Sequence, residues 1–516
     1  MAATLPELLR APGAARVPMG GLTEPDVARL IRTIAQLQPS PDLVATLHRR
    51  TEGNPLFVEE FIRLLEVEDR LSQDTVDSRW RIPEGIREVI GRRLDRLSRD
   101  CREMLRAASV AGRDFRVDIL ERASGRRGEE VMGALQDAIG ARLVEEVHDD
   151  PGTLRFTHSL IRDTIYQELM PAERHQRHAA VGEALERTYA ADPEPYVAEL
   201  AHHFFEAGPR GDPAKTAEYA TAAGTRAVLS LAYEEAIRLF RMALRPLQES
   251  PDERRRCAGL VLLGDAQARA GDQRTSKETF LAAAAIATRI GDPELLARTA
   301  LGYAGRFPFT RAGIDSHLIP LLRQALDALP VTDDPLRARL LARLAGALRD
   351  QPSTEPRASL GAEAVAMARR IGDPETLTYA LLGWWGGALL GPDELDRQFS
   401  VAAELDELAQ TIGDRELPTN AVWVRYIASL TRGDSWEARR HYSILSHLAA
   451  ELHQGPQLWY AGVMGTVIAL QDGRFEEAER LIEETVALGR QAQAWDADAS
   501  RLFALFVLRR EQDRLA

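Results

Sequence analysis

The chain has 516 residues and a formal net charge of −13, from 65 basic and 78 acidic residues. This length is too great for a single hydrophobic core, so about three to five domains or a repeat array are expected. Hydrophobic residues make up 45% of the chain and charged residues 28%, which is ordinary for folded protein and argues against intrinsic disorder. The acidic balance argues against binding of the whole chain to nucleic acid or anionic membranes.

Only two cysteines are present, Cys101 and Cys257, and both lie in segments that read as helices. They offer neither a disulfide framework nor a zinc motif, which is typical of a reducing compartment. The N-terminus lacks a basic start followed by an apolar core, and no apolar run reaches the ~18 residues that a membrane span needs. We therefore expect a soluble, cytoplasmic protein with no membrane partner.

Residues 1–81 are predicted to form a small helical subdomain. Thr23 opens a sequence that resembles a capping box and is followed by apolar residues at helical spacing. Gly53 ends a later helix, and Asn54 with Pro55 starts another, because Asn is a preferred N-cap and Pro is tolerated at the first helical position.

A second module is predicted over residues 82–172. Helical stretches lie around 101–111 and 129–141, and then the apolar period changes from 3.6 to 2. Residues 142–156 read as strand, turn and strand, since Asp, Asp, Pro and Gly supply the turn between two β-prone runs. Helices followed by one β-hairpin indicate a winged-helix module.

From residue 173 onward the pattern indicates helices only, first as connecting helices (173–212) and then as a repeat array (213–516). Gly291, Gly372 and Gly413 sit in similar strings, RIGDPE or TIGDRE, which predicts a period of about 40 residues. Gly suits the left-handed residue after a helix and Asp the next N-cap, so each copy predicts a helix-to-helix junction.

A second class of turn lies about half a period from the first and predicts two helices per repeat. Ala236 and Ala478 are six periods apart, at positions where a small side chain lets paired helices approach. We expect roughly seven tetratricopeptide-like helix pairs and a predominantly all-α fold, with a helical lid and winged helix followed by an α-solenoid. The second-class turns are Gly271-Asp272, Gly433-Asp434 and Asp472-Gly473.

Four strings occur in an order that resembles a known class of proteins. They are TEGNPLFVEEFIRLL at 51–65, IPEGIREVIGRRLDRLS at 82–98, FTHSLIRDTIYQEL at 156–169 and LAHHFFEAG at 200–208. With the repeats that follow, they resemble the bacterial signal-transduction ATPases with numerous domains, which include large LuxR-type transcription regulators and cyclase-associated AAA-like ATPases. The resemblance covers roughly residues 20 to 516. It implies that residues 1–81 are the lid of an AAA-like ATPase.

The resemblance also implies a set of nucleotide-binding residues. Gly53, Asn54 and Pro55 match the lid element whose proline packs near the adenine, and His158 matches a histidine that senses the diphosphate. Arg162 follows one helical turn after His158. A simpler interpretation stays open, in which the first three residues are only helix caps and His158 is a local hydrogen-bonding or packing residue.

The sequence departs from that class in one decisive respect. A phosphate-binding loop needs G-x-x-x-x-G-K-[ST], and no Gly-Lys pair exists in this chain. We therefore expect no catalytic residues and no cofactor bound by this chain alone, with ATP or ADP bound only by an intact protein whose core precedes Met1. A terminal DNA-binding module would lie beyond residue 516.

Other residue clusters suggest packing or solvation. The winged-helix arginines are nearly balanced by acidic residues, so we expect no direct nucleic-acid contact. Four histidines lack the spacing of zinc ligands, and no metal site is expected. A tryptophan pair in the array is expected to line its core or groove. These residues are Arg87, Arg92, Arg93 and Arg96; His175, His178, His202 and His203; and Trp384 and Trp385.

The sequence thus predicts a regulatory segment of an ATP-dependent signalling or transcriptional regulator, which is not an enzyme by itself. Its repeat array would bind a protein or small-molecule inducer, and its lid and winged helix would contact an upstream ATPase core. The alternative is a freestanding tetratricopeptide-like scaffold for protein–protein interaction.

Overall fold

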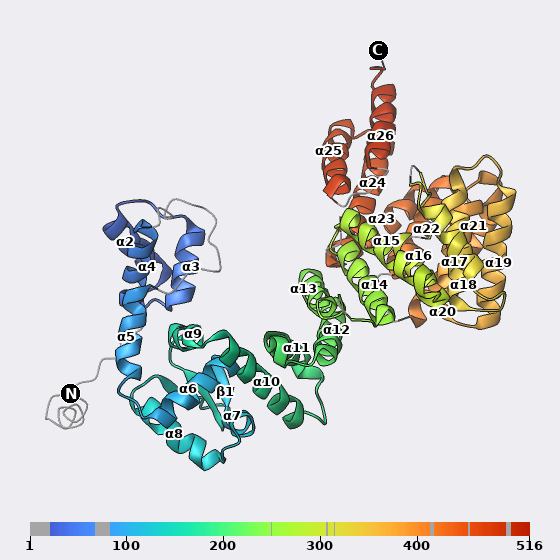
Figure 1. The fold of residues 1–516 in the computed structure, drawn as a ribbon. Coiled ribbons are helices and arrows are strands. Elements are labelled where there is room, and N and C mark those ends of the chain that lie inside the picture. The colour runs from blue at the N-terminus through green and yellow to red at the C-terminus, as the bar shows by residue number, and fades with distance from the viewer. Residues whose placement is uncertain are drawn as a thin grey trace. The chain divides into compact units, whose positions relative to one another are not determined.

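The computed structural model describes residues 21–67, 83–248, 250–305, 308–313, 315–412, 417–452, 455–491 and 497–515. The chain divides into two compact units, Met1–Lys215 and Thr216–Ala516. Both are built mainly from helices, as predicted (Figure 1). No helix in the described ranges is both long and apolar enough to cross a membrane.

The first unit begins with three helices, α2 (Glu24–Ala35), α3 (Pro41–Thr51) and α4 (Pro55–Val67). The capping box at Thr23 is present, because its side chain and backbone both interact with Asp26. Asn54 caps α4 by accepting a hydrogen bond from the backbone N–H of Leu56 at 3.1 Å. The apolar faces of the three helices meet in a core that includes Val27, Ile31, Leu43, Leu47, Phe61 and Leu65.

A three-stranded antiparallel sheet lies in the next module, with strand order β1-β3-β2. The hairpin expected at 142–156 is present as β2 (Val144–Glu146) and β3 (Thr153–Phe156). Strand β1 (Asp114–Arg116) and helix α7 (Val117–Ser124) were not foreseen, since three residues are too few to show a period of two. The remaining helices are α5 (Glu84–Leu94), α6 (Arg99–Ala111) and α8 (Gly128–Gly140).

Three helices follow the sheet and lead to the array: α9 (Ser159–Glu168), α10 (Pro171–Thr188) and α11 (Val197–Glu206). Short 3-10 turns stand before and after α11, η1 (Glu194–Tyr196) and η2 (Gly208–Arg210). The buried faces of α10 and α11 meet around Gly182, whose Cβ would lie 3.3 Å from the side chain of His203.

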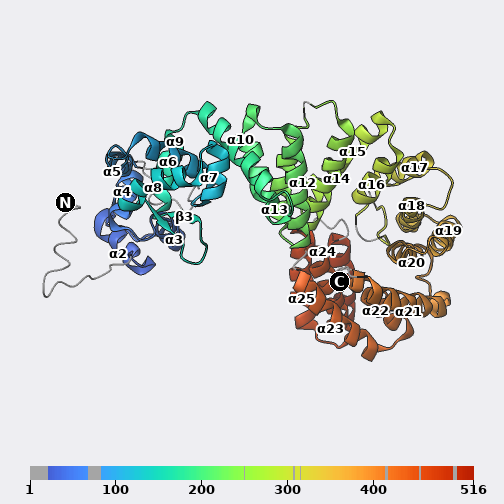
Figure 2. The same cartoon turned by 90° about the horizontal axis from the view of Figure 1, so that it is seen from below.

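The array consists of seven helix pairs in the described residues, in agreement with the predicted number, and one further helix, α26 (Ala497–Glu511). The pairs succeed one another along a curve (Figure 2). They are α12 (Pro213–Leu229) with α13 (Tyr233–Leu244), α14 (Glu253–Arg269) with α15 (Gln273–Ile290), α16 (Pro293–Tyr303) with α17 (Leu318–Ala328), α18 (Pro335–Ala347) with α19 (Glu355–Ile371), α20 (Pro374–Ala388) with α21 (Leu395–Thr411), α22 (Leu417–Arg432) with α23 (Ser435–Leu452), and α24 (Gly455–Gln471) with α25 (Phe475–Gln491).

The two classes of turn have the roles that the sequence predicted. Gly291 and Gly372 end one pair in the left-handed region, with φ of +66° and +75°. Asp292 and Asp373 then cap the first helix of the next pair through backbone N–H groups. Gly413, the third copy, lies outside the described residues. The second class joins the two helices of a pair, as at Gly271 between α14 and α15.

Small buried residues set the approach of paired helices. Ala236 in α13 and Ala478 in α25 are both fully buried, as predicted. Each stands in the second helix of its pair and contributes to an apolar cluster with neighbouring helices. A larger side chain at either position would have to push helices apart.

We therefore expect Ala236→Trp or Ala478→Trp to lower the free energy of unfolding of the array by about 1–3 kcal/mol, because overpacking a filled core costs that much. Ala487→Trp is the matched control, since Ala487 is exposed on the same helix as Ala478. Thermal and urea denaturation followed by circular dichroism measure the effect. Equal behaviour of the Ala478 and Ala487 variants would contradict the pairing.

Candidate functional site

The turn between α3 and α4 is held in a conformation that only glycine adopts easily. Gly53 has φ of +70°, and its carbonyl accepts a hydrogen bond from the N–H of Leu22 at 2.7 Å. A Cβ on Gly53 would lie 2.1 Å from the carbonyl oxygen of Leu22. The glycine is thus required by backbone geometry and by the close approach of the segment that precedes α2.

Asn54 and Pro55 follow as N-cap and first helical residue of α4, so the local interpretation of both residues is correct. Pro55 is exposed and is followed by Leu56, whose side chain is also exposed. The start of α4 therefore presents a small apolar surface.

His158 connects this turn to the module that contains the sheet. Its Nδ1 accepts a hydrogen bond from the N–H of Leu160 at 3.1 Å and thereby caps α9. Its Nε2 lies 2.7 Å from the carbonyl oxygen of Thr51, the last residue of α3. Since Nδ1 accepts, Nε2 must carry the proton and donate it, which makes the ring a neutral bridge between two helix ends.

Two further contacts support this bridge. The rings of Phe57 and His158 meet edge to face, with centroids 4.7 Å apart. Glu52, the residue after Thr51, forms an ion pair of 3.0 Å with Arg113, which precedes β1. The end of α3 is therefore fixed to the sheet module by one buried hydrogen bond and one partly exposed ion pair.

Arg162 does not join this group. Its Nε donates to the carbonyl oxygen of Ser109 near the end of α6 at 2.7 Å, and its Nη1 pairs with Asp163 at 2.9 Å. The guanidinium also lies over the ring of Tyr166, 5.0 Å from its centroid. The structure thus brings Gly53, Asn54 and Pro55 to His158 and directs Arg162 to a different helix.

The residues that the resemblance assigns to a nucleotide fit that role only in part. Pro55 is exposed at the start of α4. His158 has both ring nitrogens engaged by backbone groups, and Arg162 is held by Ser109 and Asp163, so neither is arranged to hold phosphate.

The histidines of α10 and α11 form a buried polar cluster instead of a metal site. His178 Nδ1 lies 3.0 Å from His203 Nδ1, and His178 Nε2 lies 2.9 Å from the hydroxyl of Tyr166. Burial, together with the smaller effect of positive charge on His202 and Arg162, lowers the pKa of His178 to about 3. Burial also lowers the pKa of His203 well below its usual value. No group of three metal-ligating side chains occurs among the described residues.

The connection between α16 and α17 departs from the pattern of short turns in the array. Within it, residues 308–313 lie against the first helices of later pairs. The ring of Phe309 packs edge to face on Trp385 of α20, at 5.6 Å, and lies 6.4 Å from Trp423 of α22. Gly346 and Gly386 make room for the segment, since a Cβ at either would lie within 2.1 Å of Pro308 or Phe309. Trp385 therefore packs in the core, as predicted.

A buried arginine organises this segment. Arg343 of α18 is almost completely buried and donates to the carbonyl oxygens of Ala304, at 3.0 and 3.1 Å, and of Thr310, at 2.6 Å. Beyond Thr310, the N–H of Ala312 donates to the carbonyl oxygen of Ala347 at 3.1 Å. The segment is thus held by hydrogen bonds on both sides of Arg311, which fixes the position of the Arg311 backbone.

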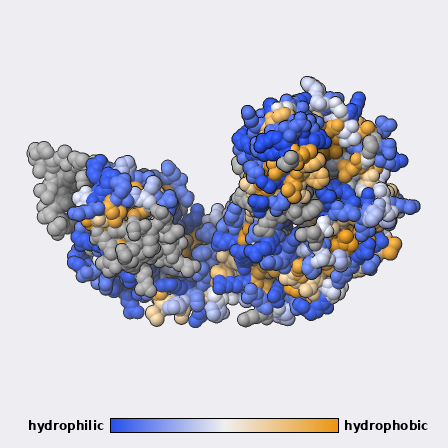
Figure 3. Space-filling view, turned by 90° about the horizontal axis from the view of Figure 1, so that it is seen from above, coloured by the Kyte–Doolittle hydropathy of each residue, from blue (hydrophilic) through white to orange (hydrophobic). Residues whose placement is uncertain are grey.

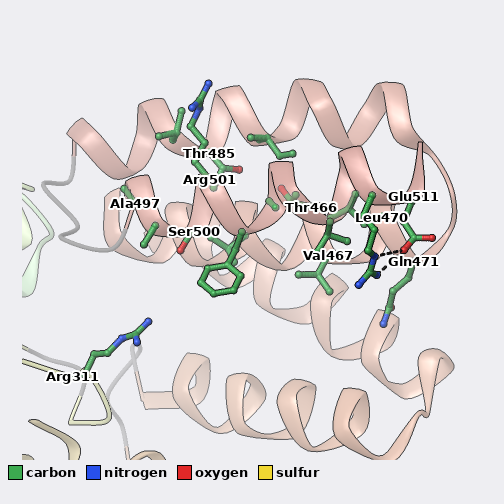
Figure 4. Close-up of a pocket in the computed structure, with 18 residues that line it drawn as sticks. Arg311, Thr466, Val467, Leu470, Gln471, Thr485, Ala497, Ser500, Arg501 and Glu511 are labelled. Carbon is green, nitrogen blue, oxygen red and sulfur yellow. Dashed lines mark hydrogen bonds and ion pairs between the residues drawn. The ribbon is translucent and has the colours of Figure 1, made fainter. Parts of the chain in front are cut away.

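Arg311 forms part of the wall of a pocket of about 590 Å³. The rest of the wall comes from α24, α25 and α26 (Figure 4). Its lining is mainly apolar, with Val467 on α24, Ile482 on α25 and Phe503 on α26 as representatives. Apolar surface is also visible on the face of the array in Figure 3. The volume lies in the range of ~300–1,000 Å³ that is typical of small-molecule sites.

The sequence did not predict this pocket. Its walls come from residues more than 150 positions apart, so no local sequence pattern marks it. No family model and no curated protein matches this sequence.

Solved structures with a similar arrangement of helices were found. One is a signal-transduction ATPase with numerous domains and a tetratricopeptide repeat sensor from Pyrococcus horikoshii, with 14% identity, coverage of 97% of this chain and 77% of that chain, and a TM-score of 0.35. A Rap protein in complex with competence and sporulation factor has 12% identity, coverage of 82% and 98%, and a TM-score of 0.36. At these TM-scores the likenesses carry no argument about function, and the fold assignment rests on the helix pairs themselves.

We expect Gly53→Ala to destabilise the subdomain of α2, α3 and α4 more than Gly125→Ala destabilises α7. Both glycines have φ of +70°, but a Cβ on Gly125 would meet no atom within 4 Å. The left-handed conformation alone costs alanine about 1–2 kcal/mol, and the clash with Leu22 adds to this at Gly53 only. Hydrogen exchange over residues 21–67 and 117–124 measures both effects, and equal losses of protection would contradict the close approach of Leu22.

The histidine cluster predicts a loss of stability in acid. The unfolded chain takes up protons at His178 and His203 near pH 6.5 and the folded chain does not, so stability is complete above that pH and falls below it. Each site contributes a slope of ~1.4 kcal/mol per pH unit. We expect the double variant His178→Gln, His203→Gln to unfold with a smaller change of thermal midpoint between pH 7.5 and 5. His447→Gln, at an exposed histidine, serves as control and should retain the full change.

Proposed function

We propose that this chain is the regulatory and sensing segment of an ATP-dependent signalling or transcriptional regulator, of the LuxR-type or cyclase-associated class, and is not catalytic by itself. The order of modules supports this proposal. Three lid helices precede a module with the order helix, strand, helix, helix and hairpin, from α6 to β3, which is the order of a winged helix. A helical array follows.

The observation that carries the proposal is the bridge made by His158. A lid that relays a signal must be mechanically joined to the module that follows it. The neutral ring of His158 makes this connection through Thr51 at the end of α3 and Leu160 at the start of α9. Because the ring is buried, its hydrogen bonds compete little with water, and the two helix ends are held as one body.

The remaining parts of the proposal concern partners. The array would bind a protein or small-molecule inducer, and the apolar surface at Pro55 and Leu56 would face the base of ATP or ADP bound by an upstream core. The winged helix would act within the molecule. Its arginines are partly engaged there, since Arg93 donates to the carbonyl oxygen of Ala141 at 2.7 Å and Arg92 pairs with Glu88 at 3.0 Å. We place the protein in the cytoplasm.

A second function is favoured by a different observation. His158 has both ring nitrogens engaged by backbone groups, and Arg162 is held by Ser109 and Asp163, which is also what a freestanding scaffold would show. In that case the array would bind a protein partner without any dependence on nucleotide. The two functions differ in whether an ATPase core is encoded next to this segment.

The test has two arms. The reading frame upstream of the Met1 codon is expected to encode G-x-x-x-x-G-K-[ST] within about one domain length. Calorimetry should then show that the extended chain binds ATP and Mg²⁺ with micromolar affinity, about 8 kcal/mol, whereas residues 1–516 bind no better than about 1 mM, about 4 kcal/mol. The backbone N–H groups and the lysine of the loop account for this difference.

A stop codon directly upstream of Met1 would favour the scaffold. Micromolar binding by residues 1–516 that disappears in Pro55→Ala would show instead that the lid itself holds the nucleotide, against our expectation.

A further inference from the structure

The pocket between α24, α25 and α26 is a built feature of the array. Arg311 lines one side of the pocket and belongs to the connection between α16 and α17. Hydrogen bonds from Arg343, packing of Phe309 and two glycines hold that connection in place. Burying a guanidinium such as that of Arg343 is costly unless its donors are satisfied, and here the carbonyl oxygens that satisfy them belong to the segment itself. These hydrogen bonds and ring contacts fix the position of the segment, so the pocket wall that contains Arg311 is a defined part of the structure.

The charges around the pocket are balanced within the protein. Arg311 lies 3.3 Å from Asp350, Arg501 lies 3.0 Å from Glu483, and Arg510 lies 2.6 Å from Glu511. An ionised ligand would have to compete with these carboxylates or arginines. The electrostatics therefore favour an uncharged ligand.

Two hydroxyl groups in the pocket are available to a ligand. Thr485 is only 7% exposed and Ser500 is partly buried, and both line the pocket (Figure 4). Neither hydroxyl has a hydrogen-bond partner among the described residues. By contrast, the hydroxyl of the neighbouring Thr466 donates to the carbonyl oxygen of Gly462 at 2.9 Å. A hydroxyl that lines a pocket and has no protein partner can still accept or donate a hydrogen bond, so Thr485 and Ser500 favour a ligand that carries an oxygen.

We propose that this pocket binds a small, uncharged and mainly apolar molecule that carries carbonyl or hydroxyl groups. The apolar body would lie against Val467, Ile482 and Phe503, and an oxygen of the ligand would meet Thr485 and Ser500. The proposal rests on the sensing role proposed for the array, because such a molecule would be the inducer. Phe503 is 73% exposed, so a ligand that covers it would remove a large apolar side chain from water.

The opposite surface of α26 allows a control. Leu502 and Phe506 are also exposed and apolar, but neither lines the pocket. If a dye or a second copy of the chain binds to that surface, substitutions of Leu502 or Phe506 should change the affinity. If the dye binds in the pocket, the same substitutions should leave the affinity unchanged.

Nile red is a suitable probe, because it is uncharged, mainly apolar and has a carbonyl oxygen. We expect a saturable rise in its fluorescence with the whole chain, with one site and micromolar affinity. Ala504→Phe, which fills the pocket, should weaken binding at least tenfold. Thr485→Val, which removes only the hydroxyl, should weaken it about three- to tenfold, as the loss of one hydrogen bond does. Leu502→Asn should leave the affinity unchanged.

Circular dichroism shows whether Ala504→Phe remains folded, and Val467→Phe replaces it if not. The proposal is overturned if the dye binds without saturation, or if Leu502→Asn abolishes binding while the pocket variants do not. A change of sedimentation coefficient with the pocket variants would assign the surface to a second copy and would also overturn it. None of these outcomes depends on an upstream P-loop, so failure here is distinct from failure of the ATPase proposal.

Discussion

A pair of antiparallel helices cannot bury both of its apolar faces alone, and this constraint shapes the whole C-terminal unit. Each pair must be covered by the next, so the core runs through the array as one stacked series of clusters. Fully buried alanines such as Ala236 and Ala478 set the distance between helices, and glycine turns set the direction of each return.

Buried polar side chains occur where the regular packing of helix pairs is interrupted, at helix ends and at an irregular connection. His158 joins two helix ends through both ring nitrogens, and Arg343 holds an irregular segment by its carbonyl oxygens. Each is satisfied by backbone groups, so neither requires a charged partner in the interior. Such residues contribute specificity of arrangement, because an alternative packing would leave the same polar atoms unpaired. Between α10 and α11, His178 instead meets two other side chains, the ring of His203 and the hydroxyl of Tyr166.

Much of the fold was predictable because it depends on local rules. The caps at Thr23 and Asn54, the glycine junctions and the hairpin at β2 and β3 follow from residue type and spacing over a few positions. Strand β1 was missed since its three residues pair with β3, about forty positions away, and carry no period of their own. Between α3 and α4, the local interpretation of Gly53, Asn54 and Pro55 was confirmed, while contact with a nucleotide stays a prediction.

The sites were less predictable, because they are made of residues that are distant in sequence. His158 could be singled out from its position, but its partner Thr51 lies 107 residues away and was not foreseen. The pocket joins Arg311 to three helices at the other end of the array. A repeat pattern still gives one usable signal, which is an unusually long connection between two helices. The connection between α16 and α17 covers residues 304–317, so it needs a source of order besides its own turns. Here that source is Arg343 and the ring of Phe309, and the segment that they fix is the one that completes the pocket.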